Sequence, residues 1–198
     1  MVAYQISNKL QDAILNDNSE TVKEQLTMGD DIFTQDKMGN SALHLAVAFG
    51  AKQSIIEMLL EHAAKLGRIE VAVNAKNNYE QTPLHLSIIY KQVHALKVLL
   101  TPANGRCFIH LKNGDLSCCL KEQPSPDLFK FQIQWDLRDE NNHTAIDYAQ
   151  MAFNAYYDRK LDQENSLKVQ VIVNLLDDRG LFKHRAVENR LSLDVSGL

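Results

Sequence analysis

The sequence predicts an all-α repeat solenoid, because one helical unit occurs twice with the same internal order. The segment Asp36–Gly50, DKMGNSALHLAVAFG, returns 41 positions later at Asn77–Lys91 as NNYEQTPLHLSIIYK. Each copy is followed by apolar residues at helical spacing that end in a leucine pair, at 59–60 and at 99–100. Self-similarity at a fixed period is typical of stacked repeats. We therefore expect the recurring Leu and His residues to belong to the scaffold, and function to lie in what departs from it.

The composition is that of an ordinary globular chain. Its 198 residues are 45% hydrophobic and 23% charged, which is enough for one domain or a short solenoid. The formal net charge is −4 with no basic block, so we expect neither nucleic acid nor an anionic membrane as a partner. No secretory signal or bilayer-length apolar run is present, and three cysteines are too few for a disulfide framework. We expect a cytoplasmic monomer, although export by a system that uses no cleaved signal would leave the same trace.

The two copies carry the start and stop signals of two short helices. Ser41 and Thr82 stand where a hydroxyl caps a helix N-terminus, and Pro83 follows at the first helical position. Gly50 ends the first helix of one copy, and Lys91 replaces it in the other. We expect second helices at 53–66 and 93–100.

These residues resemble the ankyrin repeat, whose pattern reads roughly D-x-x-G-x-T-P-L-H-x-A-A-x-x-G and then a helix ending in Leu-Leu. A third copy is recognisable at 139–149, with Thr144 in the capping place and Asp147 where His would stand. A weaker copy opens the chain. The resemblance implies an ankyrin repeat domain at 1–182, with repeats at 7–35, 36–76, 77–138 and 139–182, and a flexible tail or the start of a missing region at 183–198.

The spacing between copies is irregular, which indicates insertions. Ser41 and Thr82 lie 41 positions apart and Thr82 and Thr144 lie 62 apart, against about 33 in a standard ankyrin repeat. The first excess falls at 63–71, where we expect a longer outer helix, and the second falls at 104–134. A third insertion, at 153–166, separates the two helices of the last repeat.

The insertion at 104–134 predicts a β-hairpin in the third repeat. Two β-compatible runs, 107–111 and 116–120, flank Asn113–Gly114, a dipeptide that favours a tight hairpin turn. That turn pairs 112 with 115, 110 with 117 and 108 with 119. One face is then apolar enough to pack on the repeats, and the other, which contains Phe108, His110, Lys112, Asp115, Ser117 and Cys119, faces outward.

Catalytic and metal-binding interpretations of these residues are weaker than structural ones. Cys107, His110, Cys118 and Cys119 look like a zinc set, but strand alternation places Cys107 and Cys118 on the face opposite to the other two. Cys119 and His110 share a face without an orienting third group. The repeated His44 and His85 are explained as hydrogen-bonding scaffold. We expect no enzyme activity and no cofactor or metal.

The resemblance implies a protein-binding surface on the concave face, formed by the tips and the ends of the inner helices. Phe49 and Tyr90 occupy equivalent positions, as do Met38 and Tyr79, and large apolar groups in exposed places are typical of binding hot spots. The alternative is that the insertion covers them. With the outward hairpin face, the expected partner-binding residues are Lys37, Met38, Asn40, Phe49, Asn78, Tyr79, Gln81, Ile89, Tyr90, Phe108, His110, Lys112, Asn113, Asp115, Glu140, Asn141 and His143.

Asn74 carries a separate signal. Leu66, eight residues before it, and Val73 resemble the context in which ankyrin-repeat asparagines are hydroxylated by a eukaryotic asparaginyl hydroxylase, although Ala72 departs from the acidic residue usual there. The alternative is a hairpin asparagine that shapes a turn.

We expect this chain to be a protein–protein interaction module. Its irregular repeats resemble ankyrin effectors that intracellular bacteria such as Legionella inject into host cells, which implies a host protein as partner and the host cytosol or nucleus as location. The other interpretation is the substrate-targeting module of a longer enzyme whose catalytic domain lies beyond residue 198.

Overall fold

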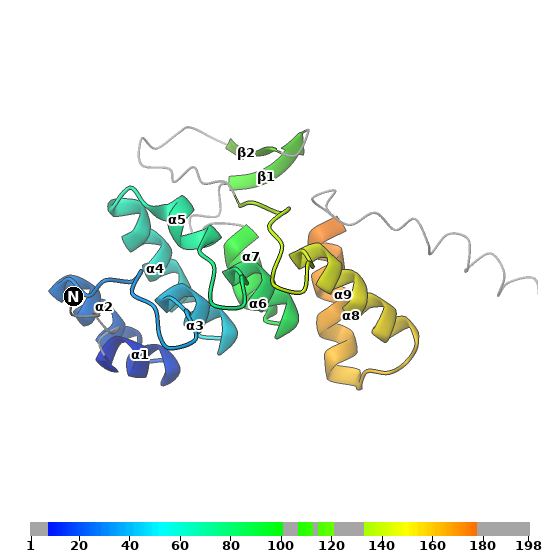
Figure 1. Cartoon of the computed structure of the whole chain (residues 1–198), viewed down its shortest axis with the longest axis horizontal. Coiled ribbons are helices and arrows are strands. Elements are labelled where there is room, and N and C mark those ends of the chain that lie inside the picture. Colours follow the sequence, from blue (N-terminus) through cyan, green and yellow to red (C-terminus); the bar gives the residue numbers. More distant parts are fainter. Residues whose placement is uncertain (1–7, 101–106, 113–114, 121–132, 178–198) are drawn as a thin grey trace, which may run out of the picture.

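The chain folds into a row of helix pairs (Figure 1), as seen in a computed structural model that describes residues 8–100, 107–112, 115–120 and 133–177. Four pairs follow one another along the chain: α1 (Asn8–Leu15) with α2 (Ser19–Met28), α3 (Ala42–Ala48) with α4 (Gln53–Lys65), α6 (Pro83–Ile89) with α7 (Val93–Leu100), and α8 (Ala145–Tyr157) with α9 (Gln163–Asp177). The other described elements are α5 (Ile69–Asn74), β1 (Cys107–Lys112) and β2 (Asp115–Leu120).

The pairs stack in two layers of helices. The first helices form one layer, in which α1 packs on α3, α3 on α6 and α6 on α8. The second helices form the other layer, in which α2 packs on α4, α4 on α7 and α7 on α9. The recurring apolar residues fill the space between the layers, and Ile55, Leu59, Leu96 and Leu99 are each at most 1% exposed. The predicted class of helical repeat fold is therefore confirmed, whereas the exact repeat boundaries stay predictions.

The first helices of the pairs are the inner helices, and three of them begin with the cap that the sequence predicts. Ser41, Thr82 and Thr144 are the N-cap residues of α3, α6 and α8, and each forms a capping box with the residue three positions on. In the first two boxes that residue is His44 or His85, and in the last it is Asp147.

Two positions after the last residue of each inner helix stands one residue with left-handed backbone. The φ values are 57° at Asp17, 67° at Gly50, 53° at Lys91 and 54° at Arg159. Such a residue lets the following N–H groups return to the last helical carbonyls, as when Ala51 donates to the carbonyl of Ala46. The first and last repeats thus share a local geometry with the middle two, although their sequences match the pattern poorly.

Two predicted insertions contain helix. The outer helix is longer, as expected, since α4 runs to Lys65, but after Gly67 (φ 65°) the chain forms a further helix, α5, that the sequence analysis did not predict. Ile69, Ala72 and Val73 of α5 are buried at the spacing of one helical face, a pattern that is too short to recognise against the adjoining long helix. The insertion at 153–166 consists mostly of the ends of these two helices, because α8 continues to Tyr157 and a five-residue turn leads to α9.

The hairpin strands pair in the expected register. β1 and β2 are antiparallel, with Lys112 opposite Asp115, His110 opposite Ser117 and Phe108 opposite Cys119. Their side chains lie outside the described part of the structure, so the proposed apolar and outward faces stay predictions. The residues expected to form a tail, 183–198, also lie outside it.

Candidate protein-binding face

The tips between the pairs are built on one polar residue each. The Oδ1 atom of Asp36 accepts hydrogen bonds from the backbone N–H groups of Met38 and Asn40, both at 2.8 Å. In the same way, the Oδ1 atom of Asn77 accepts hydrogen bonds from the backbone N–H groups of the residues two and four positions later in the chain. Oδ1 of Asp139 does the same, and all four distances are 3.0 Å. A residue with positive φ then turns the chain back in each tip: Gly39, Glu80 or Asn142. This repeated geometry holds the side chains of Met38 and Tyr79 at equivalent places.

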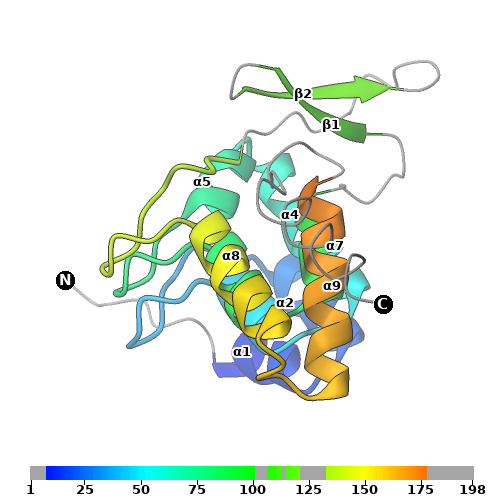
Figure 2. The same cartoon turned by 90° about the vertical axis from the view of Figure 1, so that its right-hand side faces the viewer.

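Neighbouring tips are joined by hydrogen bonds, which makes them one continuous surface. The N–H of Asn78 donates to the carbonyl of Met38 at 3.0 Å, and the N–H of Glu140 donates to the carbonyl of Tyr79 at 3.1 Å. The approach at the first junction is close, since a Cβ on Gly39 would lie 2.5 Å from the backbone nitrogen of Asn78. Figure 2 shows the three tips extending to one side of the helices.

His44 and His85 connect consecutive repeats, as the sequence analysis expects. The N–H of Ser41 donates to Nδ1 of His44 at 3.2 Å, so Nδ1 is the acceptor and the proton resides on Nε2. Nε2 then donates to the carbonyl of Gln81 in the next tip at 3.0 Å. His85 repeats both contacts, with its Nε2 3.2 Å from the carbonyl of His143.

Burial keeps both imidazoles neutral. It lowers the pKa of His44 to about 4, although the carbonyls of Gln81 and Ala75 act in the opposite direction. The pKa of His85 is also lowered, again by burial first. Both residues are at most 1% exposed and all their ring nitrogens are used, so they have a scaffold role and cannot contact a partner.

In the last tip, several hydrogen-bond donors surround the carboxylate of Asp139, a residue that the sequence analysis did not single out. Asp139 is 5% exposed, and its Oδ2 accepts from the hydroxyl of Tyr148 at 2.5 Å. Burial raises the pKa of Asp139, but this bond and those from the N–H groups of His143 and Asn141 outweigh burial and lower it to about 2. The ring of Tyr148 also meets the ring of His143 edge-on, with centroids 5.5 Å apart. The bonds to Asp139 fix the orientation of this tip.

The four large apolar residues expected at the binding face are exposed. The exposed fraction is 46% for Met38, 39% for Tyr79, 64% for Phe49 and 56% for Tyr90. Met38 and Tyr79 lie at the tips, and Phe49 and Tyr90 are the C-cap residues of α3 and α6. Most of the insertion lies outside the described part of the structure, so the alternative in which it covers these side chains stays open.

The other expected residues of this face vary in exposure. Among the described residues, those at the surface are Lys37, Asn78, Glu140 and Asn141, whereas Asn40, Gln81, Ile89 and His143 are half-buried. The side chains of Phe108, His110, Lys112 and Asp115, and Asn113 as a whole, lie outside the described part.

Two further apolar residues on the inner helices are exposed, and the sequence analysis missed both. Leu15 is 47% exposed at the end of α1, and Met151 is 44% exposed in α8. Leu15 stands two residues before the left-handed turn of its helix, and Met151 stands seven residues after its cap, each one position from the place of Phe49. A helix-by-helix alignment from the caps and turns could have found them.

Asn74 lies at the end of α5 and not in a hairpin tip, which corrects the expectation of a hairpin asparagine. Its Oδ1 accepts a hydrogen bond from the N–H of Gln134 at 2.8 Å. That bond ties the end of the insertion to the repeats, and Ile133 beside it is 2% exposed. The contact favours a structural role for the side chain, and hydroxylation stays a prediction.

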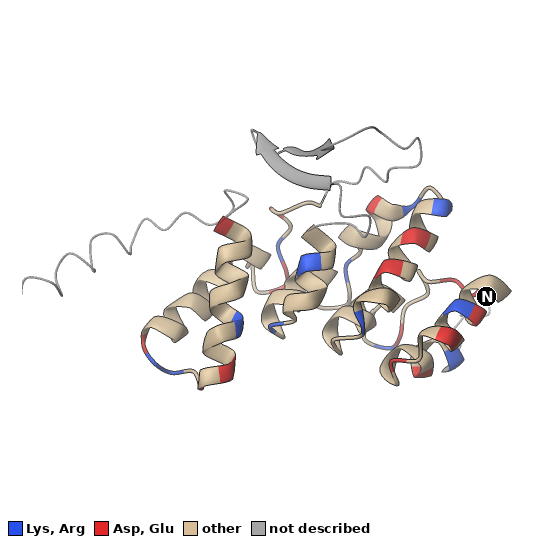
Figure 3. Cartoon of the chain, turned by 180° about the vertical axis from the view of Figure 1, so that it is seen from behind, with Lys and Arg blue, Asp and Glu red and all other residues tan. Residues whose placement is uncertain are grey.

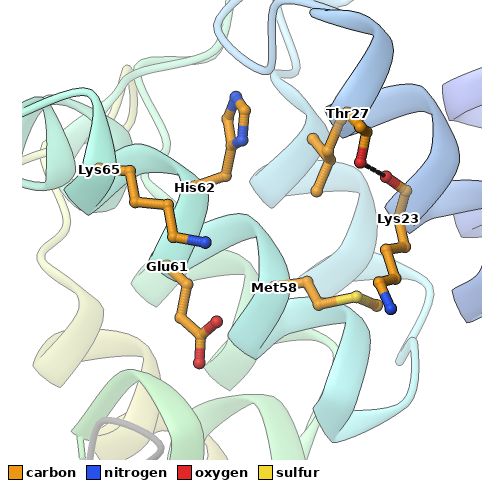
Figure 4. A pocket seen from close by; sticks show the side chains of 7 residues that line it. Lys23, Thr27, Met58, Glu61, His62 and Lys65 are labelled. Atoms are coloured by element: carbon orange, nitrogen blue, oxygen red, sulfur yellow. Dashed lines mark hydrogen bonds between the residues drawn. The ribbon is translucent and has the colours of Figure 1, made fainter.

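A hollow lies between the outer helices α2 and α4 (Figure 4). It has a volume of 330 Å³, and Lys23, Leu26, Thr27, Met58, Glu61, His62 and Lys65 line it. Charged residues of both signs gather on these two helices (Figure 3). Opposite charges in one open hollow define no ligand, so we assign none to it.

The described residues contain no group of three or more His, Cys, Asp or Glu that could hold a metal ion. Helices long and apolar enough to cross a membrane are also absent from the described part. The Cys and His side chains of the hairpin are not covered by the first statement.

Stacked pairs of short helices, capped tips and a row of exposed side chains define this chain as a helical-repeat protein. It belongs to the ankyrin repeat family, since the model for ankyrin repeats, with three copies, matches residues 10–113. Ankyrin repeats are protein–protein interaction modules.

Three curated proteins are similar to the chain. It is 29% identical over 109 residues to an ankyrin repeat protein of Fowlpox virus (strain NVSL), which covers 50% of this chain and 21% of that protein. The nuclear factor NF-kappa-B p105 subunit of Gallus gallus is 26% identical over 129 residues, covering 59% and 13%. An ankyrin repeat protein of Acanthamoeba polyphaga mimivirus is 25% identical over 185 residues, covering 91% and 24%. The chain thus spans a quarter or less of the length of these relatives.

One solved structure shows the same arrangement. A chain in the crystal structure of the yeast ribosomal protein Rps3 in complex with its chaperone Yar1 superimposes with a TM-score of 0.56 and 16% identity. The match covers 89% of this chain and 95% of that one, and it supports the fold alone.

Proposed function

We propose that this chain binds a partner protein through Met38, Phe49, Tyr79 and Tyr90, which we call the binding face. The observation that carries the proposal is their exposure at equivalent places of consecutive repeats, on a surface that the scaffold holds rigid. Large apolar side chains exposed together are typical of protein-binding sites. The solved neighbour, a component of a complex between a ribosomal protein and its chaperone, is in keeping with such a role.

Rigid presentation makes these side chains suitable anchors. Met38 and Tyr79 project from tips whose backbone N–H groups are held by Asp36 and Asn77, so little conformational entropy remains to be lost on binding. Full burial of one large apolar side chain contributes about 1.5–3 kcal/mol. Two such anchors can therefore account for most of the free energy that a hot spot supplies.

The test compares two double variants in affinity capture with mass spectrometry. In F49A/Y90A the binding face loses two anchors, whereas in the control L167A/V171A two exposed apolar residues of α9 are removed (57% and 37% exposed). We expect F49A/Y90A to lose partner proteins that both the natural chain and the control retain. Because all four side chains are solvated in the free protein, both variants should melt within a few degrees of the natural chain.

Two results would contradict the proposal. Equal partner sets for F49A/Y90A and the natural chain would show that binding lies elsewhere. A large fall in melting temperature for F49A/Y90A alone would show that these residues belong to the core.

The outward face of the hairpin is proposed as a second part of the partner surface. Its support is the paired register of β1 and β2, which places Phe108, His110 and Lys112 on one side of the ribbon. Replacement of residues 106–132 by a short flexible linker tests this part alone. Partner sets that do not change on replacement would rule the hairpin out.

A role as an effector in a host cell is a finer version of the same proposal. It is supported by the resemblance of the irregular repeats and not by the relatives, which are two viral ankyrin repeat proteins and a nuclear factor subunit of Gallus gallus. Capture from a host-cell lysate and from a lysate of the source organism, compared side by side, separates host partners from endogenous ones. The alternative of a targeting module in a longer enzyme is settled by the full-length reading frame.

A further inference from the structure

The turns that join the two helices of each pair form a second continuous surface, which we call the turn edge. It comprises residues 16–18, 49–52, 90–92 and 158–162. The N–H of Lys52 donates to Oδ1 of Asp17 at 2.6 Å, and Nε2 of Gln92 donates to the carbonyl of Ala48 at 3.3 Å. The first three turns are thus bonded in sequence, and the fourth follows because α8 packs on α6 and α9 on α7.

Two of these turns have a basic residue in a backbone conformation that favours glycine. The φ value is 53° at Lys91 and 54° at Arg159, and Gly50 takes this place in the second turn. A Cβ atom is strained there, and strained residues that persist often serve a function. In the first turn Asp17 has the same conformation, but its side chain is used in the bonds to Lys52. The fold gives no such reason for Lys91 or Arg159.

The charges of Lys91 and Arg159 are not compensated within the described part of the structure. Neither side chain has a hydrogen bond or an ion pair with another described residue. The carboxylates of the turn edge each have a donor within 3.3 Å, in the pairs Asp17–Lys52, Asp158–Lys160 and Asp162–Asn165. Two positive charges therefore remain on this edge of a chain whose formal net charge is −4. Figure 3 shows the basic residues of the last turn.

An exposed aromatic side chain precedes each of these two cations. Tyr90, directly before Lys91, is 56% exposed, and Tyr157, two residues before Arg159, is 38% exposed. Aromatic and basic residues together are suited to a segment that combines apolar groups with negative charge. The two cations do not lie level, since α8 has 13 residues and α6 has seven. Six further residues place Arg159 about 9 Å farther along the helix direction, so the ligand needs negative charges at two separate places.

The carboxylates of the turn edge favour an acidic peptide over a nucleic acid. Aromatic side chains can stack on bases as well as contact apolar residues, so they do not distinguish the two ligands. A single strand, however, has one phosphate on every nucleotide, and some phosphates would meet Asp17, Asp158 or Asp162. A peptide can place its carboxylates only where the cations are.

We propose that the partner presents an acidic segment, whose carboxylates bind Lys91 and Arg159 and whose apolar side chains contact Tyr90 and Tyr157. This inference rests on the proposed function and names the chemistry of the partner. Lys91 and Arg159 then determine specificity, while the exposed aromatic residues supply apolar contact.

Three probes test the proposal by NMR titration of the backbone amides of the whole chain. The acid probe is a peptide of 14 residues with two Phe and two separate pairs of Glu in a Gly/Ser background. The neutral probe has Gln at the Glu positions, and the third probe is a single strand of 14 thymidylates. We expect the acid probe to bind at least fivefold more tightly than the neutral probe at low salt. That ratio should fall below twofold in 0.5 M salt, because salt screens exposed charges. Shifts should follow residues 90–92 and 157–160.

Charge variants locate the bound acid probe. K91Q/R159Q should weaken the acid probe at least fivefold and leave the neutral probe unchanged. The matched control K9Q/K65Q removes two exposed lysines outside the turn edge, so it changes the net charge equally but should weaken the acid probe less than twofold.

Two variants of Lys91 separate its charge from its backbone strain. K91R should retain the affinity for the acid probe. K91G should lower it about twofold although its urea midpoint rises, because glycine relieves the strain at φ 53°. A chain that is more stable but binds less tightly is not expected of a residue with a purely structural role.

The outcomes separate this inference from the proposed function. An acid probe that binds no more tightly than the neutral probe, or that K9Q/K65Q weakens as much as K91Q/R159Q, would overturn the acidic partner. Tighter binding of the thymidylate strand would overturn it in favour of nucleic acid. If F49A/Y90A still loses its partner proteins in affinity capture, the proposed function stands in either case. If the acid probe depends on Lys91 and Arg159 while F49A/Y90A keeps its partners, the turn edge binds and the proposed binding face is wrong.

Discussion

At the scale of single residues, two positions show how the repeat determines side-chain chemistry. His44 is wholly buried with Nδ1 and Nε2 both hydrogen-bonded, so its neutral form is part of the junction between repeats. At the equivalent place of the last repeat, Asp147 forms the cap with Thr144. Among the described residues no further tip follows to accept a bond from an imidazole, which explains why a shorter capping residue suffices there.

We expect the free energy of unfolding to fall as the pH drops from about 6.5 to about 4. In this range the unfolded chain protonates His44 (pKa 6.5), whereas the folded chain with its pKa of about 4 does not, so protons favour unfolding. Protonation of His44 alone should lower the free energy of unfolding by about 3 kcal/mol over this range. Urea denaturation at several pH values measures it. H44Q should be less stable at pH 7 but show a shallower slope, and an equal slope would contradict the assignment.

Lys91 and Gly50 occupy the same left-handed position, so opposite substitutions should act in opposite directions. K91G removes the cost of a side chain at φ 53° and should stabilise the fold by about 1 kcal/mol. G50A adds that cost and places a Cβ 2.6 Å from Oε1 of Gln92, so it should destabilise by about 1–2 kcal/mol. Urea midpoints at neutral pH measure both, and shifts of the same sign would show that the turn geometry is not what decides them.

At the scale of elements, the tips and caps recur because short polar side chains satisfy backbone N–H groups in fixed positions. Asp36, Asn77 and Asp139 follow one rule in three tips, and only the last adds a tyrosine hydroxyl. The short helix α5 is held in place by tertiary contact, because its six residues bury Ile69, Ala72 and Val73 against the stack.

Y148F should loosen the last tip. It removes the hydrogen bond to Oδ2 of Asp139, and bonds to charged groups contribute about 1.5–3 kcal/mol. The pKa of Asp139 should rise from about 2 toward its ordinary value. Stability that the ionised carboxylate contributes is present above its unfolded pKa of 3.8 and is lost as the pH falls through the folded one. NMR titration of the carboxyl carbon measures the shift, and an unchanged pKa would contradict the role of Tyr148.

At the scale of the whole molecule, the stack does not depend on the insertion for its continuity. α6 packs directly on α8 and α7 on α9, and the chain rejoins the repeats at Ile133 and Gln134 through a buried side chain and the bond to Asn74. Interfaces between neighbouring repeats therefore contribute most of the stability, as in other solenoids.

Replacement of residues 106–132 by a six-residue Gly/Ser linker should leave the stack folded. A shorter loop lowers the closure entropy by about 1 kcal/mol, so the free energy of unfolding should stay within about 1 kcal/mol of the natural value. Circular dichroism and urea denaturation measure helix content and cooperativity. Loss of the cooperative transition would mean that the insertion is part of the core.

The sequence by itself determined the repeat class, the caps and the pairing of the hairpin, because each depends on local spacing and on side-chain chemistry within a few residues. The bridging role of His44 and His85 came from the resemblance to the ankyrin repeat, since their bonds reach 37 and 58 residues along the chain. Only the tertiary structure decided that Phe49 and Tyr90 are exposed, that Leu15 and Met151 are exposed as well, and that residues 69–74 form a helix. Exposure depends on what lies opposite a side chain across the stack. That is a contact between residues far apart in the chain, which no local pattern records.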